Sequence, residues 1–187
     1  YLKIPNEEIL KMFSEMFIEI YFENYETFLD MTIALKNGDV EKFKFELRKI
    51  LLENIGIFDV SGNYKEQFYH GLLLGLILML KNEYEITSNG FAGKGRYDLL
   101  LKPKNILNKL TEREGIIFEL KIVNLVEKLE KDNLKKKLER ECEIALKQID
   151  EKEYVSVLRN AGVERVLKVG VAFFGKEFEV KFEREIK

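Results

Sequence analysis

Hydrophobic and polar residues follow two different periods along this chain. Apolar positions recur every three to four residues in three segments, which predicts amphipathic helices over 7–34, 39–51 and 64–82. Short apolar runs bounded by turn-forming residues predict strands over 84–88, 98–103, 115–123, 166–174 and 178–182, the last two joined as a hairpin. A charged stretch with helical spacing, residues 124–158, precedes the hairpin. The chain is therefore expected to adopt an α/β fold.

The strand 115–123 is unusual because two charged residues interrupt an apolar run. Glu119 and Lys121 project from the same face, since successive side chains of a strand alternate. A charged side chain inside a strand that is buried on both faces is costly unless it is paired or binds a metal. Two interpretations stay open for this strand: a buried glutamate–lysine ion pair, or a functional site.

A second carboxylate stands at the start of the strand 98–103. The glycine-rich segment 93–96 predicts a tight turn, Asp98 follows it, and Pro103 ends the strand. If this strand and 115–123 are antiparallel neighbours, Asp98 and Glu119 can reach one point in space. Two carboxylates beside Lys121 would form a seat suited to a divalent metal.

The pattern Glu-x-Lys alone is not specific, because the chain contains it again at Glu179 and Lys181. Apolar and charged positions alternate around that second copy. Such alternation is typical of a half-exposed strand, so the second copy is expected to lie on a solvated face. The copy at 119–121 differs because its flanks are apolar.

Composition narrows the class of protein. The 187 residues are 34% charged and 46% hydrophobic, as in soluble globular domains, and no apolar run is long enough to cross a membrane, so we expect a cytoplasmic protein. Cys142 is the only cysteine and His70 the only histidine, which excludes a disulfide framework and any site that needs two of either residue. Residues 1–90 carry a net charge of −6 and residues 91–187 one of +4, a division that suits a polyanionic partner.

Several segments together resemble a known family. They are residues 4–7, 68–76, 93–98 with 102–104, 118–121, 145–149 and 166–173. The chain resembles the PD-(D/E)xK nuclease superfamily, and in particular the domain of that superfamily that follows an AAA-ATPase-like domain in bacterial and archaeal proteins. The resemblance implies a restriction-endonuclease-like α-β-β-β-α-β core with a mixed sheet in residues 61–187. Residues 1–60 would then be a helical appendage that links this core to an ATPase-like domain.

The resemblance also assigns roles to individual residues. Asp98 and Glu119 would be the metal-binding acids, and the carbonyl of Leu120 would be a further ligand of Mg²⁺ or Mn²⁺. Lys121 would be the catalytic lysine. Glu66, in the helix 64–82, would match the first-helix acid of many members.

A second group of residues would contact nucleic acid. Lys94 and Arg96 in the glycine-rich turn would hold the phosphate backbone. Gln148 and Tyr154 would match the polar residues of the helix that follows the lysine strand. Tyr97 replaces the proline that usually precedes the acid in the superfamily.

Three functions are compatible with these features. The first is metal-dependent hydrolysis of nucleic acid, with DNA as the expected substrate. The second is a catalytically silent nuclease-fold module that binds nucleic acid or protein and is attached to an ATPase. The third is a structural adaptor, in which the N-terminal helices contact the ATPase-like domain.

Overall fold

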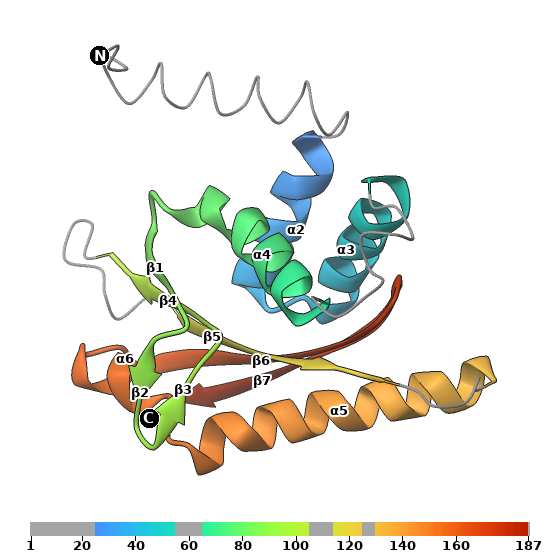
Figure 1. The fold of residues 1–187 in the computed structure, drawn as a ribbon. Coiled ribbons are helices and arrows are strands. Elements are labelled where there is room, and N and C mark those ends of the chain that lie inside the picture. Colours follow the sequence, from blue (N-terminus) through green and yellow to red (C-terminus); the bar gives the residue numbers. More distant parts are fainter. Residues whose placement is uncertain (1–24, 55–64, 105–113, 125–129, 187) are drawn as a thin grey trace, which may run out of the picture.

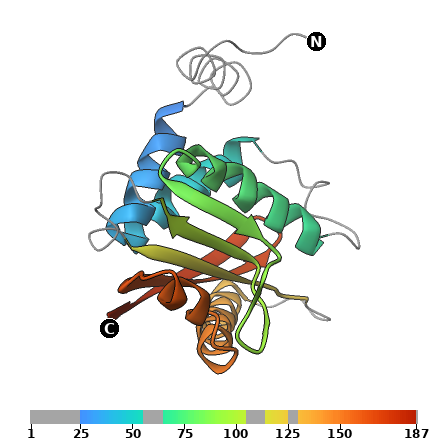
Figure 2. The same ribbon diagram turned by 90° about the vertical axis from the view of Figure 1, so that its left-hand side faces the viewer.

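A five-stranded sheet separates two layers of helices in this protein (Figure 1). The computed structural model describes residues 25–54, 65–104, 114–124 and 130–186. One face of the sheet is covered by α2 (Tyr25–Asn37), α3 (Val40–Asn54) and α4 (Lys65–Ile77), and the other by α5 (Lys131–Glu151). Figure 2 shows the two layers from the side. The helix predicted over 7–34 is described only from residue 25 onward; its earlier part lies outside the described residues.

The boundary between α2 and α3 lies where the sequence predicts it. Gly38 has a φ of +68°, a left-handed conformation that glycine adopts without steric cost. The Oδ1 atom of Asp39 then accepts a hydrogen bond from the N–H of Lys42 at 3.0 Å, which caps the start of α3. Gly38 and Asp39 thus separate the two helices, in agreement with the predicted start of the second helix at residue 39.

The sheet is mixed. Its order is β1 (Tyr84–Ser88), β4 (Leu99–Pro103), β5 (Gly115–Ile122), β6 (Arg165–Phe174) and β7 (Glu177–Ile186). All neighbours are antiparallel except β5 and β6, which are parallel. The elements α4, β1, β4, β5, α5 and β6 give the order α-β-β-β-α-β, so the expected core is confirmed.

Smaller elements complete the described part of the chain. The 3₁₀-helix η1 (Leu78–Leu80) extends α4, and β2 (Phe91–Ala92) pairs with β3 (Gly95–Arg96) around Gly93, whose φ is +52°. β3 falls in the segment 93–96 that the sequence predicts only as a turn, and β2 lies directly before it. None of the helices in the described ranges is both long and apolar enough to cross a membrane.

The predicted single helix 124–158 is wrong at both ends. Asn124 is not helical, and α5 begins only at Lys131. After Glu151 the chain turns, with Glu153 at a φ of +56°, before the short helix α6 (Ser156–Asn160) begins. The turn places the carbonyl of Lys152 where it accepts the N–H of Lys94 at 2.7 Å. A tertiary contact thus accompanies the interruption of the helical pattern here.

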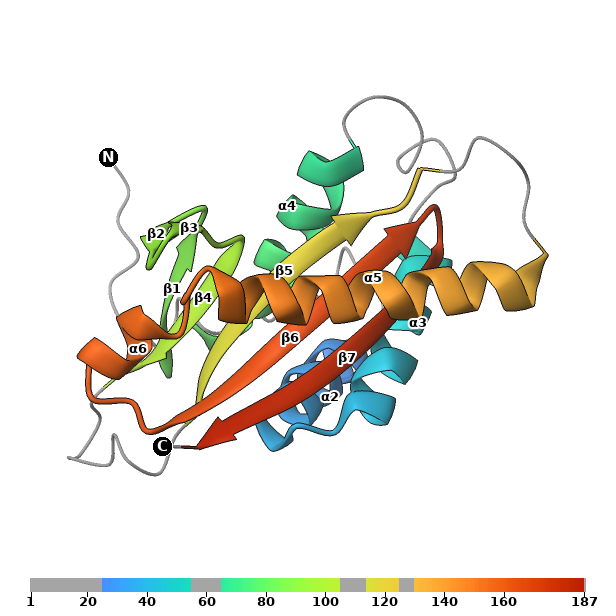
Figure 3. The ribbon, with the colours of Figure 1, turned by 90° about the horizontal axis from the view of Figure 1, so that it is seen from below.

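Apolar side chains fill the space on both sides of the sheet. On the side of α2, α3 and α4, one cluster unites these helices with β4, β5, β6 and β7; its largest fully buried members are Tyr69, Phe43, Phe118, Phe173 and Phe178. On the other side, α5 crosses β5, β6 and β7 (Figure 3). Because α2 and α3 share the first cluster with the sheet, they pack as part of the core. The division at residue 60 remains a prediction.

Candidate active site

The antiparallel pair β4 and β5 brings the two predicted acids together. Leu99 pairs with Phe118, so Asp98, one residue earlier, lies beside Glu119 on the neighbouring strand. The Oδ2 atom of Asp98 accepts a hydrogen bond from the main-chain N–H of Leu120 at 2.7 Å. This bond fixes the Asp98 carboxylate against the middle of the Glu-x-Lys segment.

Glu119 is buried and only partly satisfied. It is 3% exposed, and its Oε1 atom accepts hydrogen bonds from Lys121 Nζ at 3.0 Å and from Gln148 Nε2. Lys121 Nζ also donates to Gln148 Oε1 at 2.6 Å. The other carboxylate oxygen, Oε2, is buried and has no hydrogen-bond partner among the described residues. A buried carboxylate oxygen without a partner is costly, so a missing ligand is the simplest physical explanation.

Gln148 reaches the site because α5 lies unusually close to the sheet. Gly170 on β6 pairs with Glu119, and a Cβ atom at Gly170 would lie 2.5 Å from the carbonyl oxygen of Cys142 on α5. The absence of a side chain therefore permits this approach. Gln148 then lies beside β5 and links Lys121 to Glu119.

The electrostatics of the pair follow from burial and from like charge. Burial raises the pKa of the Glu119 carboxyl to about 7, with a further contribution from the negative charge of Asp98, while Lys121 opposes the rise. Burial also raises the pKa of Asp98; the Leu120 N–H, His70 and Lys121 act in the opposite direction. One lysine does not compensate two neighbouring carboxylates, so the ionised site has a deficit of positive charge.

A divalent metal would supply the missing charge. Asp98 and Glu119 offer hard carboxylate oxygens, the donors that Mg²⁺ and Mn²⁺ prefer, and the carbonyl of Leu120 lies on the same strand. The described part of the chain contains no group of three His, Cys, Asp or Glu side chains suited to a metal. Two carboxylates, a carbonyl and water nevertheless suit Mg²⁺, which usually keeps several waters. The unpaired Oε2 of Glu119 therefore fits such an ion.

α4 approaches the same pair of acids. Glu66 is exposed near its start, and its negative charge raises the pKa of both Asp98 and Glu119, which places it within electrostatic range of the site. One turn later, His70 Nε2 lies 3.2 Å from the main-chain oxygen of Asp98 and 3.3 Å from Ser88 Oγ. The sequence suggests for His70 only a structural role in its helix. The signal that it belongs near the site is its spacing of four residues from Glu66.

The predicted nucleic-acid contacts occupy different environments. Lys94 is exposed and forms an ion pair with Glu153. Arg96 is exposed, and its carbonyl accepts a hydrogen bond from the Tyr154 hydroxyl at 2.8 Å. Tyr154 is 2% exposed and also lies 3.4 Å from Gln148 Nε2. The Tyr154 hydroxyl thus accepts a hydrogen bond from Gln148. A direct contact with nucleic acid stays a prediction for Lys94, Arg96, Gln148 and Tyr154.

The second Glu-x-Lys copy is not on a solvated face, so that expectation is wrong. Glu179 is 6% exposed and forms an ion pair with Lys44 of α3 at 2.6 Å. β7 lies at the edge of the sheet, and α3 packs beside it, which covers a residue that alternation alone predicts to be exposed.

Comparison with known proteins agrees with this geometry. A family model described as the PD-(D/E)XK nuclease superfamily matches residues 64–183, which include both acids, Lys121, Gln148 and the whole of the α-β-β-β-α-β core. A comparison with curated proteins gives no significant match.

Proposed function

Because the chain belongs to the PD-(D/E)XK nuclease superfamily, we propose that it hydrolyses phosphodiester bonds of nucleic acid, most readily DNA, with Mg²⁺ or Mn²⁺. One observation carries the proposal: Glu119, Asp98 and Lys121 converge at the centre of the sheet, and a buried oxygen of Glu119 lacks a partner among the described residues. The ion pair with Lys121 uses only the other oxygen, Oε1, so it does not compensate the burial of Oε2.

Each residue has a separate task in this proposal. Asp98, Glu119 and the Leu120 carbonyl would hold the metal, which lowers the pKa of water and neutralises charge on the phosphate. Lys121 Nζ would donate hydrogen bonds to the attacking water or to a phosphate oxygen. Gln148 fixes the positions of the Lys121 and Glu119 side chains relative to each other, because it accepts a hydrogen bond from the first and donates one to the second. Glu66, at the edge of the site, would position water or a second cation.

The decisive experiment measures cleavage of labelled single- and double-stranded DNA and RNA in Mg²⁺ and in Mn²⁺. Lys121→Ala is expected to reduce the rate about 10²-fold or more, because it removes a donor aimed at the reacting phosphate. Lys181→Ala removes the same kind of residue from the second copy and should cut at the wild-type rate. If the wild-type protein cuts no substrate in either metal, the catalytic proposal is wrong.

A catalytically silent binding module is the alternative. Two observations favour it. Lys121 and Gln148 already donate hydrogen bonds to Oε1 of Glu119. In addition, the described residues place no third acidic side chain with Asp98 and Glu119 to hold a metal. Calorimetric titration with Mn²⁺ separates the two functions. Binding that is lost in Asp98→Asn favours the nuclease, and an absence of binding favours the silent module.

The role of the N-terminal region is part of the proposal. Residues 1–60 would connect the nuclease-like region 61–187 to an AAA-ATPase-like domain of the same full-length protein, acting on nucleic acid in the cytoplasm. Co-purification of separately expressed ATPase-like domain with this chain would support that arrangement. Loss of the interaction on deletion of residues 1–24, which leaves the core helices α2 and α3 in place, would identify the appendage as its binding surface.

A further inference from the structure

One flank of α5 leads from the candidate active site to the beginning of the helix. Gln148 lies in the site, and Ile144, Glu141 and Lys137 precede it by four, seven and eleven residues, so they share its side of the helix. Arg140 lies between Lys137 and Ile144 on the outer edge of this side. We call Lys137, Arg140, Glu141 and Ile144 the Gln148 flank. Arg140 is exposed and Ile144 is 42% exposed, so the flank is open to solvent.

The basic residues of this flank differ from two other cations of α5 and resemble Lys131 and Lys136, for which the described residues likewise offer no ion pair. Lys135 and Lys147 each form an ion pair with a glutamate four residues later on the same helix. Lys137 and Arg140 form no ion pair within the described ranges of the chain. Arg140 does lower the pKa of Glu143, but Glu143 is already hydrogen-bonded to a lysine of β7. Two cations thus remain available beside the site.

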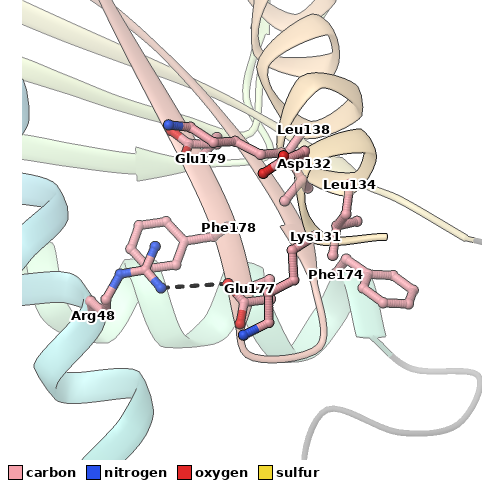
Figure 4. A pocket seen from close by; sticks show the side chains of 10 residues that line it. Arg48, Lys131, Asp132, Leu134, Leu138, Phe174, Glu177, Phe178 and Glu179 are labelled. Carbon is pink, nitrogen blue, oxygen red and sulfur yellow. Dashed lines mark hydrogen bonds and ion pairs between the residues drawn. The ribbon is translucent and has the colours of Figure 1, made fainter. Parts of the chain in front are cut away.

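The opposite flank of α5 is electrically balanced. A cavity of about 500 Å³ lies there, between α3, α5 and the turn from β6 to β7 (Figure 4). The charged side chains that line it are three cations and three carboxylates: Arg48, Lys131, Lys135, Asp132, Glu177 and Glu179. Arg48 also forms an ion pair with Glu177 at 3.4 Å. A polyanion gains little from such a surface, so charge favours the Gln148 flank.

We infer that the Gln148 flank holds the sugar–phosphate backbone on one side of the scissile bond, with Lys137 and Arg140 as its phosphate-binding side chains. This rests on the proposed function, because the flank serves a substrate only when a phosphodiester lies at Glu119 and Lys121. Eleven residues of helix span about 16 Å, which corresponds to about five base pairs of duplex. Glu141 lies within the flank and weakens the attraction.

Salt-dependent binding tests the inference. In the Lys121→Ala background with Mg²⁺, the double variant Lys137→Gln/Arg140→Gln should bind a labelled duplex about tenfold more weakly at low salt. The slope of log K against log salt should fall by about two, roughly one for each lost phosphate contact. Lys131→Gln/Lys135→Gln removes the same charge from the opposite side of the same helix and should leave the slope nearly unchanged. Glu141→Gln should tighten binding.

The outcomes separate this inference from the proposed catalysis. Equal slopes for the two double variants overturn the inference, even if the wild-type protein cuts DNA. A protein that binds duplex without cutting it disproves the catalytic proposal, while a selective loss of slope in Lys137→Gln/Arg140→Gln still supports the flank. Absence of any nucleic-acid binding overturns both. The length of the duplex gives a further test. When the duplex extends less than about five base pairs from the scissile bond along the Gln148 flank, it should bind both double variants with equal affinity.

Discussion

Two Glu-x-Lys segments lie on the same face of one sheet, and only one of them forms a candidate active site. The strand β6 runs between them and presents only small residues to both. Its Gly170 pairs with Glu119 and Lys181, and its Ala172 pairs with Lys121 and Glu179. Both glutamates are buried, at 3% and 6% exposure. α5 packs on the small residues of β6, so it extends one flank toward each segment (Figure 3).

The two segments differ in how their charges are compensated. Glu179 is paired with Lys44 of α3 at 2.6 Å, and Lys181 is paired with Glu143 of α5 at 2.5 Å, so each charge of the second copy has its own partner. In the first copy Lys121 and Glu119 pair with each other, and Asp98 adds a further negative charge. A buried glutamate is therefore not in itself the sign of a site. The missing countercharge is the distinguishing feature.

The largest effect is expected from a pair of matched substitutions, Glu119→Gln and Glu179→Gln. Glu119→Gln removes a metal ligand and should reduce cleavage about 10²-fold or more. Glu179→Gln leaves Lys44 only its longer contact with Glu41 at 3.9 Å and should lower the free energy of unfolding by about 1–3 kcal/mol, yet retain cleavage within a few-fold. Cleavage rates and thermal unfolding of both variants measure these effects. Similar losses of cleavage in the two variants would show that the compensation of charge does not distinguish the segments.

The next effect concerns stability and pH in the metal-free protein. The pKa of Glu119 is about 7 in the folded protein, against an ordinary value of 4.5. Because the folded state binds this proton more tightly than the unfolded chain, Glu119 lowers stability as pH rises from about 4.5 to 7, by up to about 3 kcal/mol. Glu119→Gln should remove that loss, so the variant should be the more stable protein at pH 8.

Urea unfolding at pH 5 and pH 8 measures the difference between wild type and Glu119→Gln, which cancels the other titrating groups. Adding Mn²⁺ at pH 8 should stabilise the wild-type protein and have little effect on the variant, since a ligand that binds only the folded state raises stability. An identical pH dependence in both proteins would contradict the raised pKa of Glu119.

Much of the fold could be predicted from local sequence. The glycine-rich turn before Asp98 and the apolar run around Glu119 predict two strands, and a short connection favours their antiparallel pairing. If the strands are antiparallel neighbours, the two acids lie side by side, and the register of β4 and β5 meets that condition. Local patterns succeed here because the relevant residues lie on adjacent strands.

The rest depends on contacts between segments distant in sequence. Burial of Glu179 requires α3 to lie beside the edge strand, which alternation within β7 cannot indicate. The turn after α5 accepts a hydrogen bond from the main-chain N–H of Lys94 at the carbonyl of Lys152, 58 residues later in the chain. The proximity of His70 to Asp98 likewise depends on how α4 packs on the sheet. The roles of the site residues remain predictions.

A smaller effect is expected from Gly170→Ala, which tests the contact that α5 makes between the two segments. The added methyl group would lie 2.5 Å from a main-chain oxygen of α5, so the helix must move away from β6. We expect a loss of about 1–3 kcal/mol in stability and slower cleavage, because Gln148 moves with the helix. Gly75→Ala is a suitable control: it lies in α4 with no atom within 4 Å of the added carbon, and alanine should stabilise the helix slightly. Unchanged cleavage in Gly170→Ala would mean that the position of α5 does not matter to the site.

The smallest effect is expected for Glu143→Gln, on the flank of α5 that faces β7. Glu143 and Lys181 are 63% and 37% exposed, and solvent screens an ion pair of this kind. The hydrogen bond from Lys181 lowers the pKa of Glu143, so any stabilisation exists at neutral pH and disappears as pH falls through that pKa. The melting temperature and the cleavage rate should therefore match those of the wild type at pH 7.

Gln148→Ala, on the other flank, removes the hydrogen bonds to Glu119 and Lys121 and should slow cleavage about tenfold. If Glu143→Gln slows cleavage as much as Gln148→Ala, the two flanks of α5 are not functionally distinct.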